Sequence, residues 1–210
     1  MLGYIIKDFL LIKQNLRSLV ILLSVFVFLQ MSGDVSMTFV LPFMAVMLFI
    51  TTFSYDEFNG WDAFAATLPG SRRLTVASKY VATLLLIAVV FVITFILNIG
   101  IGLFKQGPDV NLIISELIGT FISVLLIMSL LYPVTYKYGI QKGRIFLFVF
   151  AFLFVGGMSL LGTFADFEKL PAPDPVFLNN YLPGILLAAT LLLLSGSYML
   201  SVRFYSRKDF

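Results

Sequence analysis

Residues 54–80 read SYDEFNGWDAFAATLPGSRRLTVASKY and form a polar island between segments that are almost entirely apolar. The charged residues of this island, together with the only tryptophan of the chain, are Asp56, Glu57, Trp61, Asp62, Arg72, Arg73 and Lys79. So many charged groups cannot stay within hydrocarbon, so the island is expected to lie in water. It therefore divides the chain into apolar segments that precede it and apolar segments that follow it.

The composition of the whole chain indicates an integral membrane protein. Of the 210 residues, 60% are hydrophobic and 12% are charged, whereas a soluble domain has about 25% charged residues. Cysteine and histidine are absent, which removes thiol chemistry, the commonest metal ligand and the usual general base. The chain also lacks the GxxxxGK(S/T) loop that binds ATP. We therefore expect no catalytic site, metal or cofactor in this chain.

The number of membrane spans follows from the apolar segments and the basic residues. A spanning helix needs about 20 mostly apolar residues. Six segments meet or approach this length, namely residues 18–31, 35–53, 80–104, 112–132, 145–164 and 181–202. Residues 32–34 read Ser-Gly-Asp, so the first two segments could instead form one long helix and leave five spans.

The distribution of lysine and arginine favours six spans over five. With six spans and a cytosolic N-terminus, every basic residue except Lys105 and Lys169 lies on the cytosolic side. With five spans, most of the basic residues would lie outside, against the usual excess of positive charge in the cytosol. The sequence therefore predicts an all-α membrane protein with six spans, cytosolic termini and a cytosolic island.

The N-terminal segment, residues 1–17, has the pattern of an amphipathic helix. Its apolar positions at helical spacing are Leu2, Ile5, Ile6, Phe9, Ile12 and Leu16, and its polar positions on the opposite side are Lys7, Asp8, Gln14 and Asn15. A helix of this kind tends to lie in the membrane interface. We expect an interfacial helix here, and the alternative is an extension of the first span.

Local signals within the island predict two short helices. The order Ser54, Tyr55, Asp56, Glu57 fits a capping box with Ser54 as the N-cap. The first helix would reach Thr67, and Pro69-Gly70 would end it. Phe58, Trp61 and Phe64 would give it an apolar ridge.

The two arginines of the island conflict with their expected position. Arg72 and Arg73 would lie in the first turn of the second helix, where the helix dipole disfavours cations. Something else must hold them there, and lipid phosphates, an acidic partner surface or simple anchoring with Lys79 are the alternatives.

Few polar groups lie within the predicted spans. Asn98 is a candidate pathway residue, although a hydrogen bond between helices also explains it. Glu116 is a candidate gate, although a position at the water interface near a helix N-terminus explains it as well. Phe146, Phe150 and Phe154 share one face of the fifth span and are candidates for an aromatic pathway lining. Phe148 and Phe152 point the other way, which favours lipid contact and packing.

The island resembles the loop between the second and third spans in small bacterial type-2 ABC exporter permeases. The residues that carry the resemblance are Asp56-Glu57, Trp61, Leu68-Pro69, Ser71-Arg72 and Ser78-Lys79-Tyr80. The length, the six predicted spans and the interfacial N-terminal helix extend the resemblance over the whole chain. Within the family, the chain is similar to permeases of phenol-soluble-modulin exporters, which expel amphipathic peptides.

The resemblance implies a division of labour between subunits. Two permeases, either identical or related chains, form the pathway, and two copies of a separate cytosolic ATPase bind ATP and Mg. The island, as a coupling loop over 54–80 of the single permease domain 1–210, would dock on that ATPase. The implied contact residues are Asp56, Glu57, Trp61, Leu68, Pro69, Arg72 and Arg73. A large extracellular domain is lacking, since only residues 166–180 make an appreciable outer loop.

The sequence thus favours the permease subunit of an ATP-driven exporter in the bacterial cell membrane, with amphipathic or toxic and antimicrobial peptides as the expected cargo. The alternative is a membrane scaffold or sensor that does not transport and whose island docks a soluble cytosolic regulator. A secondary transporter fits less well, because such proteins keep ionisable or unwound polar sites near the midplane.

Overall fold

The computed structural model describes residues 2–32, 37–67, 72–105, 107, 109–149, 152–153 and 181–208. All regular secondary structure within these residues is helical. The helices are α1 (Leu2–Ser32), α2 (Met37–Phe58), α3 (Trp61–Thr67), α4 (Arg72–Lys105), α5 (Val110–Tyr138), a helical stretch over 140–149, and α7 (Leu182–Ser206). The predicted all-α class is confirmed for this part of the chain.

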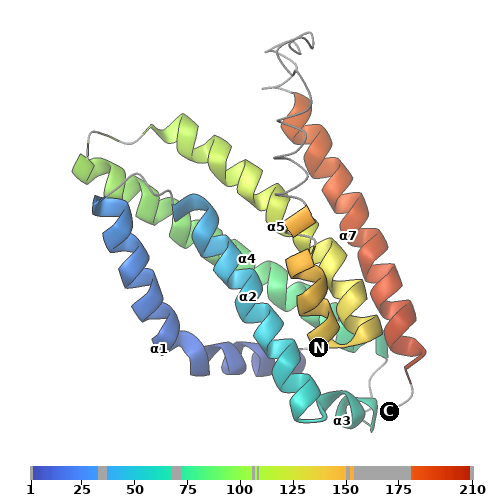
Figure 1. The fold of residues 1–210 in the computed structure, drawn as a ribbon. Coiled ribbons are helices and arrows are strands. Elements are labelled where there is room, and N and C mark those ends of the chain that lie inside the picture. Colours follow the sequence, from blue (N-terminus) through green and yellow to red (C-terminus); the bar gives the residue numbers. More distant parts are fainter. Residues whose placement is uncertain are drawn as a thin grey trace.

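The helix α4 occupies the middle of the bundle and packs against α1, α2, α5 and α7. The short helix α3 lies at one end of the bundle, near both chain termini (Figure 1), and we call this the α3 end. The buried core is concentrated toward the same end, with members such as Phe49, Ile87, Met128, Tyr132 and Tyr205. Further from α3, apolar side chains of α4 and α7 such as Ile96 and Leu192 are exposed, as expected for helix faces that contact lipid or a partner.

Four described helices are long and apolar enough to cross a membrane: Val40–Phe58, Arg72–Phe104, Val110–Tyr138 and Leu182–Ser206. They overlap the second, third, fourth and sixth predicted spans. Most of the fifth predicted span, 145–164, lies outside the described residues, and so does the loop 166–180. Six spans therefore remain a prediction, whereas a multi-pass membrane protein is supported.

The first two predicted spans are separate helices that meet near residue 98. The Gln30 side chain of α1 donates to the Asn98 Oδ1 atom at 3.0 Å, and Asn98 Nδ2 donates to Thr38 Oγ1 of α2 at 3.2 Å. Because the end of α1 and the start of α2 both reach the same amide, the chain turns back between them. This arrangement rules out the alternative of one long helix.

The helix α1 is continuous in hydrogen bonding but changes direction. Its first part lies across the α3 end, and the remainder runs up beside α2 (Figure 1). Residues 1–17 follow the predicted two-sided pattern only in part. Gln14 is exposed and Ile12 is buried, as expected, but Asp8 is 1% exposed and the apolar Leu2 and Ile6 are exposed. The expectation for Asp8 was wrong because the carboxylate meets buried lysines, a long-range contact that helical periodicity does not reveal.

The predicted capping box at Ser54 is also wrong. The helix α2 continues through Ser54 to Phe58, and the Ser54 hydroxyl donates to the Ile50 carbonyl one turn earlier. A serine can occupy a helix interior when its hydroxyl is satisfied in this way. The break comes at Asn59-Gly60, where Gly60 adopts a φ of 64° that is favourable only for glycine. Asp56 and Glu57 therefore end α2 rather than begin a new helix.

Candidate functional site at the α3 end

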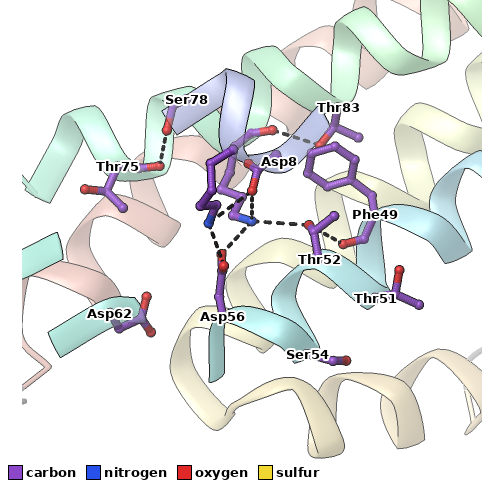
Figure 2. A network of polar contacts seen from close by, with 12 residues as sticks. Asp8, Phe49, Thr51, Thr52, Ser54, Asp56, Asp62, Thr75, Ser78 and Thr83 are labelled. Carbon is purple, nitrogen blue, oxygen red and sulfur yellow. Dashed lines mark hydrogen bonds and ion pairs between the residues drawn. The ribbon is translucent and has the colours of Figure 1, made fainter. Parts of the chain in front are cut away.

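Four ionisable side chains, of which all but Lys7 are buried, meet where α1, α2 and α4 converge, and we call them the four-charge cluster: Lys7, Asp8, Asp56 and Lys79. The Lys79 amine lies 2.7 Å from Asp8 Oδ1 and 2.7 Å from Asp56 Oδ2. The Lys7 amine lies 2.5 Å from Asp56 Oδ1 and 3.2 Å from Asp8 Oδ1. Figure 2 shows Asp8 and Asp56 on opposite sides of the nitrogen atoms that join them. Each carboxylate therefore contacts both amines.

The four-charge cluster is electrically neutral and largely shielded from solvent. The side chains of Asp8, Asp56 and Lys79 are exposed by 8% or less, and only that of Lys7 reaches 20%. Desolvating an ion pair is costly, and removing one partner leaves an uncompensated buried charge. The alternating arrangement leaves no member of the cluster uncompensated, because each charge has two opposite neighbours. The cluster thus fixes the N-terminal segment of α1 against α2 and α4.

Neighbouring side chains extend the four-charge cluster to α3. The Lys79 amine also donates to Thr52 Oγ1 at 3.2 Å and lies 4.9 Å from the centre of the Phe53 ring. The Lys7 amine lies 4.3 Å from the centre of the Trp61 ring, a cation–π distance. Trp61 is the first residue of α3 and packs edge-on against Tyr4 of α1. The start of α3 is therefore attached to α1 as well as to α2.

Glu57 and Ser54 hold the helical stretch 140–149 near the α3 end. The Glu57 Oε2 atom accepts from the Ile140 backbone amide at 2.8 Å, so the carboxylate caps the start of that stretch, where the helix dipole favours negative charge. Arg144 donates to the Ser54 hydroxyl at 2.7 Å. Gly139 makes the preceding turn with a φ of 85°. The predicted contact residue Glu57 thus has an intramolecular partner.

The C-terminal end of α7 provides the hydrogen-bond acceptors for Arg72. The Arg72 guanidinium donates to the Ser206 and Lys208 carbonyls at 2.6 and 3.2 Å. These carbonyls lie at the end of α7, where the helix dipole favours a cation. Arg72 does begin α4, as predicted, and the α7 carbonyls hold it there. The described contacts of Arg72 are therefore within the chain.

A second residue of α3 also reaches α7. Asp62 accepts from the Tyr205 hydroxyl at 3.3 Å and lies 3.5 Å from the Lys208 amine. Together with Trp61 on α1 and the direct connection to α2, this contact ties α3 to helices from both ends of the chain. A displacement of α3 would consequently act on α1, α2 and α7 at once.

The cavity beneath α3 is small. It is lined by Asp56, Glu57, Asp62, Lys79 and Tyr136 among others, and its volume is about 30 Å³. This space suits about two water molecules and excludes a nucleotide or peptide. The charged groups around it contact one another or other parts of the chain.

Buried hydroxyl groups join the helices just above the four-charge cluster. The Tyr80 hydroxyl of α4 lies 2.7 Å from Ser197 Oγ and 2.9 Å from Ser201 Oγ of α7. Thr83 and Tyr132 form a hydrogen bond between α4 and α5. The Tyr80 and Tyr132 rings pack edge to face with their centres 4.6 Å apart. These contacts link α4, α5 and α7 where they leave the α3 end.

Several residues at the α3 end point outward. Phe58 is 89% exposed and Phe64 is 54% exposed, and Arg73 is exposed as well. Phe58 ends α2, whereas Phe64 lies in α3, so the predicted ridge is divided between two helices. The predicted contact residues Leu68 and Pro69 lie outside the described residues.

The candidates within the spans are dispersed. Asn98 is buried and bridges α1, α2 and α4, in agreement with the hydrogen-bond interpretation. Glu116 is exposed in the N-terminal half of α5. Phe146 is 39% exposed and Phe148 is 66% exposed, while Leu147 between them is buried. Phe150 and Phe154 lie outside the described residues. Asn98, Glu116 and Phe146 thus lie on three different helical segments.

Sequence reasoning missed the roles of Lys7, Asp8 and Lys79. Lys79 was interpreted as a membrane anchor, yet it is 5% exposed. The available signal was the occurrence of Lys7-Asp8 in an otherwise apolar helix and of Lys79 at the start of a long apolar run. Ionisable residues in such positions usually pair with one another, although the sequence does not identify the partners.

The fold and the α3 end define a multi-pass membrane protein, helical in its described regular structure, with a short helix that lies between two spans and also contacts α1 and α7. A family model described as ABC-2 family transporter protein matches residues 3–206. The chain therefore belongs to the ABC-2 transporter family and is a transmembrane subunit of an ABC transporter. No curated protein and no solved structure matches it significantly.

Proposed function

We propose that this chain is the permease subunit of an ATP-driven exporter in a bacterial cell membrane. Two permeases pair in the membrane, and a separate cytosolic ATPase binds ATP and Mg and hydrolyses the nucleotide. The proposed cargo is an amphipathic peptide, including toxic or antimicrobial peptides. Membership of the ABC-2 family and the absence of a P-loop in the sequence support this division of labour. Family membership also favours transport over the scaffold or sensor alternative.

The observation that carries the proposal is the attachment of α3 to several spans. Trp61 and Asp62 of α3 contact α1 and α7, and α3 follows α2 after the two-residue break at Asn59-Gly60. The exposed Phe58 and Phe64 give this end an apolar surface that a soluble subunit can cover. A push on α3 by the ATPase would then move the ends of α1, α2 and α7 together, as a rigid-body transition requires.

The proposed docking region combines exposed residues with residues that also contact the rest of the chain. The exposed Phe58 and Phe64 form the described part of the proposed contact surface, and Leu68 and Pro69, which lie outside the described residues, remain predicted members of it. The other predicted contact residues are Asp56, Glu57, Trp61, Arg72 and Arg73. Glu57 and Arg73 are exposed. Asp56, Glu57, Trp61 and Arg72 also contact other parts of the chain and so support the proposed surface.

The test is co-expression with the ATPase encoded beside this chain, followed by purification of the complex and measurement of ATP hydrolysis with added amphipathic peptides. Replacing both Phe58 and Phe64 by alanine is expected to lower recovery of the ATPase about tenfold, because exposed aromatic anchors dominate such interfaces. Phe148→Ala is the matched control, since Phe148 is similarly exposed but lies in the stretch 140–149. Equal recovery with both variants would contradict the assignment of the docking surface.

A further inference from the structure

A groove separates the beginning of α4 from the end of α7 at the α3 end. It has a volume of about 490 Å³ and is lined by Arg73, Tyr198, Met199, Val202, Arg203 and Ser206. Only Arg73 comes from α4, and the other lining residues lie on the last three turns of α7. The groove is distinct from the small cavity beneath α3, which shares none of these residues.

The end of the groove nearest the chain terminus is basic. Arg73 and Arg203 are both exposed, and no acidic residue lines the groove. Within the part of the chain that the structure describes, no hydrogen bond or ion pair is formed by either guanidinium. The neighbouring Arg72 joins the start of α4 to the end of α7 by hydrogen bonds to the Ser206 and Lys208 carbonyls. The two arginines therefore line one groove to which no described acidic residue contributes.

The other end of the groove is apolar. Tyr198, Met199 and Val202 lie on α7 before Arg203 and Ser206, and Met199 is 71% exposed. From Tyr198 to Ser206 the helix rises about 12 Å. Leu182–Ser206 is long and apolar enough to cross a membrane. A span with Arg203 at the membrane surface would place this strip along the adjoining hydrocarbon. The groove thus presents cations at the surface and an apolar wall at depth.

We propose that the α4–α7 groove binds an anionic phospholipid of the membrane leaflet at the α3 end. The lipid phosphate contacts Arg73 and Arg203, and an acyl chain lies along Tyr198, Met199 and Val202. Guanidinium groups bind phosphate oxygens in a bidentate manner, and basic pockets between spanning helices suit anionic headgroups. A phosphate at this place also compensates for the unfavourable position of Arg73 in the first turn of α4.

A phospholipid explains the groove better than an acidic protein surface does. A soluble partner can reach the two arginines but not the apolar strip, which descends into the membrane. A free phosphate would contact the two arginines but not the apolar residues Tyr198, Met199 and Val202. The lipid assignment does not depend on the ATPase docking proposed for Phe58 and Phe64, which lie outside the groove.

The experiment measures lipid binding to the purified full chain in detergent micelles by native mass spectrometry. Phosphatidylglycerol and phosphatidylcholine with identical acyl chains are titrated separately. We expect the first lipid to bind roughly tenfold more tightly or better, because two cationic side chains near a membrane surface each favour an anionic lipid several-fold. Replacing Arg73 and Arg203 together by glutamine should abolish this preference. Met199→Ser should weaken phosphatidylglycerol binding while some preference over phosphatidylcholine remains.

The matched control replaces Lys13 and Arg17 by glutamine, which removes two exposed positive charges outside the groove. It should bind phosphatidylglycerol like the unmodified chain. Thermal unfolding of each variant checks that the exposed substitutions leave the fold intact. Glycerol phosphate, which has the headgroup but no acyl chains, should not displace the lipid at millimolar concentration.

Three results would overturn the proposal. One is equal binding of both lipids, and another is an equal loss of binding in the groove variant and the charge-matched control. Efficient displacement by glycerol phosphate would show a simple anion site. If the groove variant instead binds lipid normally but no longer copurifies with the ATPase, the groove is a protein-docking surface.

Discussion

At the scale of single residues, Lys79 shows how position changes the role of a charge. In the sequence it belongs to a basic segment, yet its amine reaches both Asp8 and Asp56 in the buried four-charge cluster. Lys7 also contacts both carboxylates but retains some exposure to solvent. Lys79 is therefore the member whose loss leaves the most buried negative charge without compensation.

Lys79→Ala is expected to lower the free energy of unfolding by about 3–5 kcal/mol, because it leaves two buried carboxylates with one amine between them. The measurement is thermal or denaturant unfolding of the purified chain in detergent. Lys142→Ala is the control, since Lys142 is exposed and outside the four-charge cluster, and it should change stability by no more than about 0.5 kcal/mol.

A second variant separates charge compensation from side-chain packing. Adding Asp8→Asn to Lys79→Ala removes one of the stranded charges, so part of the lost stability should return. If the double variant is as unstable as the sum of the two single variants, the charges do not act as a coupled set.

At the scale of elements, the stretch 140–149 depends on close contact with α5. Its buried positions Ile140, Gly143 and Leu147 follow helical spacing and form one face. A Cβ atom at Gly143 would lie 2.7 Å from Thr135 Oγ1 and 3.6 Å from the Thr135 Cα atom. Thr135 is itself fixed, because its hydroxyl donates to the Leu131 carbonyl at 2.9 Å. This glycine therefore permits an approach that a larger residue would prevent.

Gly143→Ala is expected to destabilise the chain by about 1–3 kcal/mol, since overpacking a buried contact forces neighbouring groups to move. Gly196→Ala in α7 is the matched control, because nothing lies within 4 Å of its added Cβ atom. That control should be neutral or stabilising, as alanine is the better helix former. Unfolding midpoints that fall equally for both variants would contradict a specific contact at Gly143.

At the scale of the whole molecule, local patterns predicted the helical class and the separation of the chain by a polar island. Patterns of hydropathy and charge extend over neighbouring residues, so they can be recognised in the sequence alone. The four-charge cluster depends on pairs such as Lys7 with Asp56 and Lys79 with Asp8, which are 49 and 71 residues apart. Such pairs follow from the packing of α1 across the α3 end, and no local pattern specifies that packing.

The difference between local patterns and long-range packing also explains why one prediction about the island was correct and another was wrong. Arg72 was predicted correctly at the start of α4, but its partner is the carbonyl end of α7, more than a hundred residues away. Ser54 was predicted as a cap, but packing of α2 extends the helix past it until Gly60 permits the break. Charge and turn signals thus located the start of α4 and the presence of a break in the island, whereas tertiary contacts set the partners of each residue.

The orientation of the whole molecule can be tested directly, because the natural chain contains no cysteine. With six spans and cytosolic termini, the start of α5 faces the outside and the stretch 140–149 begins in the cytosol. Asn111 and Lys142 are exposed positions in these two regions. A membrane-impermeant maleimide should therefore label Asn111→Cys in intact cells and label Lys142→Cys only after permeabilisation. The cysteine-free parent measures background labelling, and the reverse pattern would place the α3 end outside and exclude a cytosolic ATPase as its partner.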